Sequence, residues 1–192
     1  MGSVIQCFLV QPTTTYRVNL RRYSKDSKCS VNSWCHNADT FVAVEEHEDP
    51  PTNGDLHPHD DPKWPLKCDL CDYQFVEEDY WQKNYDLVYR ADDGREFTLT
   101  SPDQMTNDKG MMAPPGAIWE CSWMGPGDDG KSYCVRTPGG DWHIDGHYKQ
   151  GRWKRTGVAP NFTVTPSILI GTKADGSWQY HGFLTGGKLI EC

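Results

Sequence analysis

Short runs of β-forming residues, each ended by a turn cluster, constrain this chain more than any other feature. Val, Ile, Thr, Tyr, Phe and Trp gather in the runs, and Gly, Pro, Asn and Asp gather between them. The 18 Gly and 13 Pro among 192 residues leave little room for long helices, because both residues end helices and favour turns. We therefore expect a mainly β fold, a β-rich α+β arrangement with one or two short helices.

The strand pattern recurs along the whole chain. Residues 11–15 (Gln-Pro-Thr-Thr-Thr) are expected to turn between the first two strands, and residues 92–94 (Asp-Asp-Gly) predict a second hairpin. Residues 75–83 are the best helix candidate, and residues 45–62 are expected to be a long polar loop. The expected strands are residues 4–10, 16–20, 40–44, 86–90, 96–100, 132–136, 141–145, 163–170, 179–184 and 188–191.

The net charge of -8 argues against a nucleic-acid partner. A general nucleic-acid binder carries a basic face, whereas the dense basic patches here, Arg21-Arg22 and residues 152–155, are short. The apolar runs fall well short of the ~20 residues that a membrane-spanning helix needs. The N-terminal segment has no basic region and no small-residue cleavage site. We therefore expect no signal peptide, no membrane association and folding in a reducing cytoplasm.

Cys68 and Cys71 form a Cys-x-x-Cys pair, the clearest metal-ligand spacing in the chain. A redox role would need a strand and a long helix around this pair, and the surrounding sequence has neither. In a reducing compartment the pair favours zinc, with the remaining ligands upstream. Four protein ligands leave no place for water, so the predicted zinc ion is structural. The preferred ligands are Cys29, His36, Cys68 and Cys71, with Cys35 as the substitute for His36.

The length of the chain suits one compact domain, residues 1–192. Within it we expect an irregular zinc-knuckle subregion at residues 25–75 and a C-terminal β subregion at residues 113–192. Four further cysteines stand apart from one another in the sequence, and we expect them to be small buried hydrophobic residues. They are Cys7, Cys121, Cys134 and Cys192.

The C-terminal segment carries the most specific motifs, Pro166-Ser167-Ile168 and His181-Gly182-Phe183, followed by a Gly-Gly turn and a final apolar strand. With these motifs the chain resembles a group of small tailed-phage and bacterial proteins, and residues 139–145 are similar to phage sequences too. The resemblance covers about the last third of the chain. It implies a virion-associated structural protein, such as a zinc-stabilised capsid or tail decoration component. Its partners would be other virion proteins and its own copies, and assembly would take place in the host cytoplasm.

Some members of this group are peptidases of bacterial ubiquitin-like conjugation operons, and they imply a second function. The resemblance makes Ser167 the nucleophile and His181 the general base, because a serine hydroxyl needs a nearby base to take its proton. A third group must orient the imidazole, and the candidates are Asp145, Asp141 and Asp175. The Gly-x-Ser-x-Gly elbow of many hydrolases is missing from the sequence. We therefore place the structural function first and the Ser–His peptidase or hydrolase second.

Overall fold

The computed structural model describes residues 2–25, 37–55, 61–101, 104–121, 125–145, 147–148, 151–172, 174 and 178–192. These residues form strands, turns and loops, and none of them lies in a helix. The fold is therefore all-β over this part of the chain, and the α+β expectation is wrong in its helices. In the same ranges no helix has the length and apolarity that crossing a membrane requires.

The chain divides into two compact units. The first contains Met1–Pro12 and Tyr89–Cys192, and the second contains Thr13–Val88. Two long strands, β2 (Phe8–Tyr23) and β5 (Tyr80–Ala91), supply residues to both units. The expected C-terminal subregion lies in the first unit, and the expected zinc-knuckle subregion lies in the second.

The second unit is built on the antiparallel pair of β2 with β3 (Asn37–Glu46), and β4 (Gly54–Asp55) pairs with β5. The guanidinium of Arg22 is central to its interior, because this side chain is buried and lies 3.2 Å from the ring centre of Trp81. Arg22 also donates to the backbone oxygens of Pro65 and Val76, at 3.3 and 2.6 Å. A buried cation of this kind is stabilised by ring contact and hydrogen bonds together.

Asp79 ends the turn that leads into β5. Its carboxylate accepts hydrogen bonds from the Val76 and Lys25 N–H groups and from the Tyr73 hydroxyl, at 2.9, 3.1 and 3.0 Å. Burial opposes ionisation of this carboxyl, but these bonds and the nearby Arg22 lower the pKa of Asp79. The helix predicted at residues 75–83 is wrong, because a turn closed by Asp79 is followed directly by the strand.

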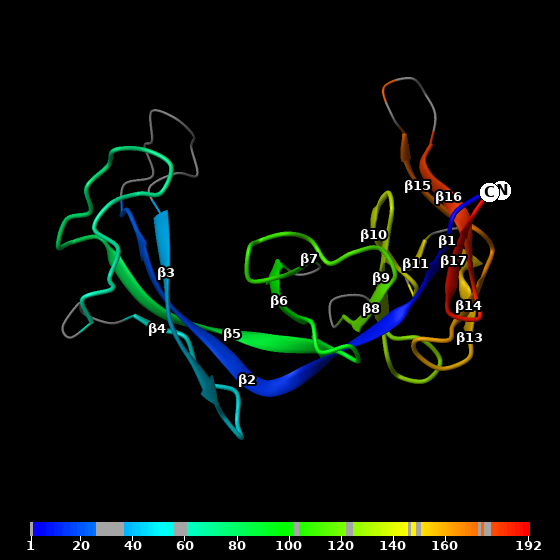
Figure 1. Cartoon of the computed structure of the whole chain (residues 1–192), viewed down its shortest axis with the longest axis horizontal. Helices are drawn as coiled ribbons and strands as arrows, with labels where there is room; N and C mark the ends of the chain where they lie inside the picture. Colours follow the sequence, from blue (N-terminus) through cyan, green and yellow to red (C-terminus); the bar gives the residue numbers. More distant parts are fainter. Residues whose placement is uncertain are drawn as a thin grey trace. The chain divides into compact units, whose positions relative to one another are not determined.

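The first unit contains a four-stranded sheet in the order β1-β17-β16-β15. The two chain ends, both in this unit, lie side by side at β1 and β17 (Figure 1), where Glu191 N–H donates to the Ser3 carbonyl. A larger sheet runs in the order β10-β9-β8-β2-β5-β6-β7. The strands of the first unit not yet bounded are β1 (Val4–Gln6), β6 (Glu96–Ser101), β7 (Gln104–Thr106), β8 (Ala117–Glu120), β9 (Tyr133–Thr137), β10 (Gly140–His143), β11 (His147–Tyr148), β12 (Gly151–Arg152), β13 (Lys154–Thr156), β14 (Thr163–Thr165), β15 (Ile168–Thr172), β16 (Trp178–Thr185) and β17 (Lys188–Glu191).

Strands β8 and β9 separate two hydrophobic clusters of the first unit, because successive side chains of a strand point to opposite faces. Ile118, Tyr133 and Val135 belong to the cluster that also contains Phe162 and Leu184. The intervening side chains belong to the other cluster, which we call the inner cluster. Its buried members are Val10, Ala91, Phe97, Met105, Ala113, Ala117, Trp119, Cys121 and Cys134.

Most of the expected strands are confirmed, including the hairpin of β5 and β6 with its turn at Gly94, where φ is 86°. The hairpin expected across residues 11–15 is wrong, because β2 continues through this segment. Its threonines favour an extended backbone, and the Thr13 hydroxyl donates to the Val88 carbonyl at 2.8 Å. The long loop expected at residues 45–62 is shorter in the structure, since β3 runs to Glu46 and β4 lies inside the segment.

Candidate metal centre

Three neighbouring strands bring two cysteines and a histidine to one face of the larger sheet. Cys134 in β9 is paired directly with His143 in β10 and with Trp119 in β8. Cys121 follows the end of β8, and its N–H donates to the Ser132 carbonyl, which continues the same ladder. Cys121 therefore lies diagonally across from Cys134, two residues along the strand and on the same face.

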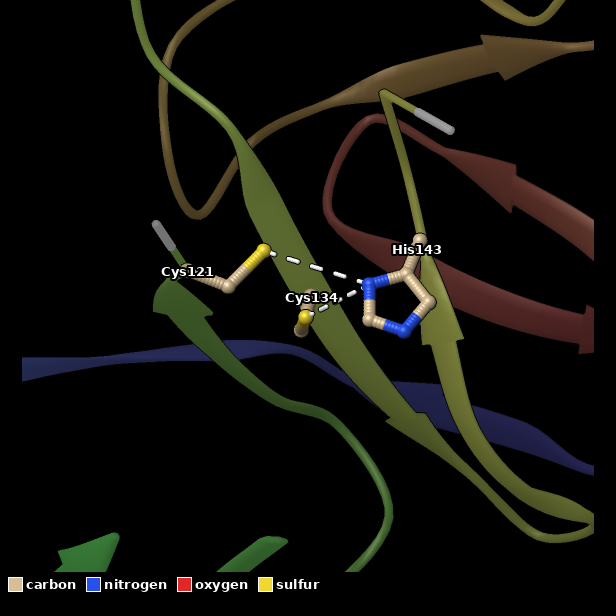
Figure 2. Close-up of side chains that lie close together, drawn as sticks. All are labelled: Cys121, Cys134 and His143. Atoms are coloured by element: carbon tan, nitrogen blue, oxygen red, sulfur yellow. Dashed lines mark hydrogen bonds between the residues drawn. The ribbon is translucent and has the colours of Figure 1, made fainter. Parts of the chain in front are cut away.

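The ligand atoms of these residues converge. The Sγ, Sγ and imidazole nitrogen atoms of Cys121, Cys134 and His143 lie within 4.8 Å of one another. His143 Nδ1 is 3.0 Å from Cys134 Sγ and 3.9 Å from Cys121 Sγ, and Figure 2 shows both thiols directed at this nitrogen. Both cysteines are buried and the histidine is half-buried.

The geometry fits a tetrahedral metal ion. Zinc with Zn–S of about 2.3 Å and Zn–N of about 2.0 Å holds sulfur and nitrogen ~3.5 Å apart. The two observed S–N distances, 3.0 and 3.9 Å, lie on either side of that value. Two thiols and an imidazole are also the ligand types that zinc prefers. The cluster of Cys121, Cys134 and His143 can therefore hold a metal ion with small side-chain adjustments.

The same geometry disfavours a disulfide between the two cysteines. Diagonal neighbours across an antiparallel pair have Cα atoms about 7–8 Å apart. A disulfide needs Cα atoms about 4.4–6.8 Å apart, so forming one here would require movement of β8 or β9. An ion between the sulfurs bridges the longer separation without moving the backbone.

The electrostatic environment favours the thiolate, which is the form that binds metals. The hydrogen bond with Cys134 lowers the pKa of the Cys121 thiol to about 5, with contributions from His143 and Ser132, although burial opposes the shift. Cys7 shows the contrast, because burial raises the pKa of that thiol to about 12. The surroundings of Cys121 thus favour the charged thiolate, and those of Cys7 favour the neutral thiol.

The predicted zinc knuckle is described only in part. Cys68 is buried and Cys71 is half-buried, and both belong to a small cluster with Ala38, Tyr73 and Phe75. The Leu70 N–H donates to Cys68 Sγ at 3.4 Å, so the segment forms a tight turn around the sulfur. The other predicted ligands lie outside the described residues, and this site stays a prediction. They are Cys29, Cys35 and His36.

The structure brings the predicted Ser167 and His181 together. His181 lies in β16 opposite Leu169 of β15, and its Nε2 is 3.3 Å from Ser167 Oγ. Ser167 is half-buried and His181 is exposed. The pair lies diagonally on the outward face of the four-stranded sheet. In the part of the chain that the structure describes, no carboxylate bonds to the His181 ring.

The three aspartates considered as the orienting group have other surroundings. Asp145 accepts hydrogen bonds from Arg155 Nε at 2.8 Å and from the Tyr133 N–H at 3.0 Å. Asp141 forms an ion pair with Arg136 at 3.0 Å. Asp175 lies outside the described residues.

The sequence interpretation missed the converging cluster, because it took Cys121 and Cys134 for plain hydrophobic residues. The expected burial is confirmed for Cys7, Cys121 and Cys134 and is wrong for Cys192, which is exposed. A signal was present in the short connection between β9 and β10. Thr137 pairs with Gly140, so only two residues turn the chain, and this register places Cys134 opposite a histidine.

Comparison of the chain with models of protein families, with curated protein sequences and with solved structures finds no match in any of the three. The cluster itself is therefore the starting point for function.

Proposed function

We propose that this chain is a structural protein of a phage particle, whose first unit is stabilised by one zinc ion on Cys121, Cys134 and His143. The convergence of these three ligand atoms is the observation that carries the zinc part of the proposal. An ion there would link β8, β9 and β10 at the point where β8 ends. Structural zinc contributes folding free energy directly, because the unfolded chain has no preformed site.

Burial supports a structural ion over a catalytic one. Cys134 is 0% exposed and Cys121 is 4% exposed, and both pack in the inner cluster beside Trp119. A catalytic zinc ion must offer an open position to substrate, and these ligands lie in the core. The three side chains fill three positions of a tetrahedron, one fewer than structural zinc sites usually take from protein, so burial is the observation that favours a structural ion.

The assembly role draws on the resemblance of the C-terminal motifs to phage sequences and on the outward face of the four-stranded sheet. In register, Val4 of β1 lies beside Ile190 of β17, which lies beside Phe183 of β16. Val4 is 61% exposed and Phe183 is 45% exposed, and Leu169 of β15 is 42% exposed on the same face. Neighbouring apolar side chains on a sheet face are typical of surfaces that contact other chains.

Metal analysis tests the zinc site. We expect purified protein to lose one equivalent of zinc when His143 is changed to alanine, and to keep that equivalent in a Cys7→Ala control. Cobalt(II) exchanged for zinc should show a tetrahedral spectrum with thiolate charge-transfer bands that weaken in Cys121→Ala. Equal metal content in the wild type and in His143→Ala would refute the site. Any zinc bound at the predicted Cys68–Cys71 site is present in all these proteins, so it does not affect the difference in zinc content between them.

Particle analysis tests the assembly role separately. Particles purified on a density gradient from cells that encode this chain should contain it in a fixed ratio to the major capsid protein, as measured by quantitative mass spectrometry. Its presence only in the soluble lysate would exclude a virion component and would leave the zinc site untouched.

The contact between Ser167 and His181 supports a second candidate, a serine hydrolase. The 3.3 Å separation is within reach of proton transfer once substrate tightens the pair. Expected for this candidate is covalent labelling by a fluorophosphonate probe that disappears in Ser167→Ala and falls strongly in His181→Ala. If the probe leaves Ser167 unlabelled, the hydrogen bond is structural and this candidate is withdrawn.

A further inference from the structure

The first unit contains a hollow of about 460 Å³ that neither the metal cluster nor the Ser167–His181 pair uses. The turn at residues 126–129 forms one side of it, and residues 153–157 form the other. Its size is within the range of small-molecule sites, about 300–1,000 Å³.

A rigid ion-pair network forms part of the wall of this hollow. The side chain of Arg155 is 8% exposed and that of Asp145 is 5% exposed, and they meet at 2.8 Å. Arg155 also donates to both carboxylate oxygens of Asp129, at 3.1 and 2.7 Å. The guanidinium lies 5.0 Å from the ring centre of Tyr133 and 4.7 Å from that of Phe162. Charged groups that are buried, paired and stacked in this way are preorganised for binding.

The residues that line the hollow include both hydrogen-bond donors and acceptors. The carboxylates of Asp128, Asp129 and Asp145 line it together with the cations of Lys154 and Arg155. Asp129 is the most available acceptor among the paired groups, because half of its side chain is exposed. A ligand that fits must itself both donate and accept, and it needs no net charge.

Trp153 adds an aromatic wall to this polar set. Its indole N–H already donates to the Ser167 carbonyl at 3.3 Å, and its ring meets Trp142 edge to face at 5.2 Å. These contacts fix the ring where it borders the hollow. Aromatic rings attract the C–H faces of ligands, which carry partial positive charge.

From this combination we infer that the hollow binds a neutral saccharide. Hydroxyl groups donate and accept at once, which suits a wall that contains both carboxylates and cations, and the C–H face of a pyranose suits Trp153. An anion would have to displace Asp129 from Arg155, and a cation would meet Lys154 and would compete with Arg155 for the carboxylates of Asp129 and Asp145. A polyhydroxyl ligand requires neither displacement nor repulsion. The inference stands apart from the zinc site and from the assembly role.

Saturation-transfer NMR with glucose, galactose, mannose, N-acetylglucosamine, maltose, lactose and chitobiose tests the inference. We expect at least one sugar to bind with a dissociation constant on the order of 1 mM. Trp153→Ala should weaken this binding at least about tenfold, and Lys154→Ala should weaken it several-fold. Lys154 is exposed, so the second variant keeps the fold if the first does not. Lys188→Ala, an exposed lysine of β17 that does not line the hollow, should bind like the wild type.

Two results would overturn the inference. One is the absence of saturation transfer from every sugar at about 10 mM in folded wild-type protein. The other is binding that survives unchanged in Lys154→Ala and, where it folds, Trp153→Ala. Binding of inorganic phosphate and of calcium is measured in parallel. If either ion binds more tightly than the sugars and its binding is weakened by Lys154→Ala in the same way, the hollow is assigned to that ion instead.

Discussion

Replacing Cys134 by alanine, beside the same replacement at Cys7, separates the metal contribution from the packing contribution. Both thiols are buried, Cys134 at 0% and Cys7 at 4% exposure, and they belong to different clusters of the first unit. Removing either sulfur leaves a small cavity that costs about 1 kcal/mol. Without metal the two variants should therefore be destabilised alike.

Zinc should then distinguish the two variants. An ion present at 100 times its dissociation constant stabilises the folded state by about 2.7 kcal/mol. For a chain of 192 residues this corresponds to ~5–11 °C in melting temperature. We expect this rise in the wild type and in Cys7→Ala. We expect its loss in Cys134→Ala, because the two ligands that remain bind the ion too weakly.

The assay is thermal denaturation of protein stripped with a chelator, with a phosphine reductant present, before and after addition of zinc sulfate. Any zinc at the predicted Cys68–Cys71 site acts on all three proteins equally, so the difference between the variants reports only on the cluster. If zinc raises the melting temperature of Cys134→Ala as much as that of Cys7→Ala, Cys134 is not a ligand and the proposed centre is wrong.

Three further perturbations test the fold. Gly116→Ala should lower the free energy of unfolding in urea by ~2–3 kcal/mol, because φ is +99° and the new Cβ would lie 2.7 Å from the Gln6 carbonyl oxygen. Gly94→Ala, where φ is +86° and the space around the Cβ is open, should lower it by ~1 kcal/mol. The lowered pKa of Asp79 means that the unfolded state binds the proton more readily, so this group stabilises the fold above the unfolded pKa of about 3.9. This contribution is lost as pH falls through the lower folded pKa. Asp79→Asn should be less stable at neutral pH and should lack this part of the stability loss in acid, and an unchanged loss in acid would contradict the assignment. Iodoacetamide should alkylate exposed Cys192 well before the buried thiols, as mass spectrometry of the native protein would show, and equal rates would contradict the burial pattern.

The parts of the fold that were predictable are those set by neighbouring residues. The turn at residues 92–94 needs only its own Gly and the β-forming residues on each side, so β5 and β6 follow from the sequence. Tertiary bonds decided the two segments that were wrong. Asp79 closes a turn by bonding to groups from separate parts of the second unit, and Thr13 bonds to Val88 across 75 positions. Local propensity contains neither contact.

The same distinction separates the two candidate sites. Ser167 and His181 are 14 positions apart on adjacent antiparallel strands, so a single pairing brings them together. The cluster of Cys121, Cys134 and His143 needs two registers to be correct at once, β8 with β9 and β9 with β10. An error of one residue in either register sends a ligand to the opposite face of the sheet. Spacing rules such as Cys-x-x-Cys do not detect ligands brought together in this way.

The position of the cluster also gives a physical reason for a metal. Two thiols and an imidazole lie at the edge of a cluster otherwise built from apolar side chains such as Trp119, Phe97 and Met105. Burying polar groups there is unfavourable unless they find strong partners, and the thiol–imidazole contacts supply only weak hydrogen bonds. A zinc ion turns the same three groups into ligands and ties together three strands whose connecting turns are rich in glycine. Replacing all three by apolar residues of similar size should therefore give a fold whose stability no longer depends on zinc, whereas the wild type should lose stability when zinc is removed; a purely catalytic ion predicts that neither protein depends on zinc for stability.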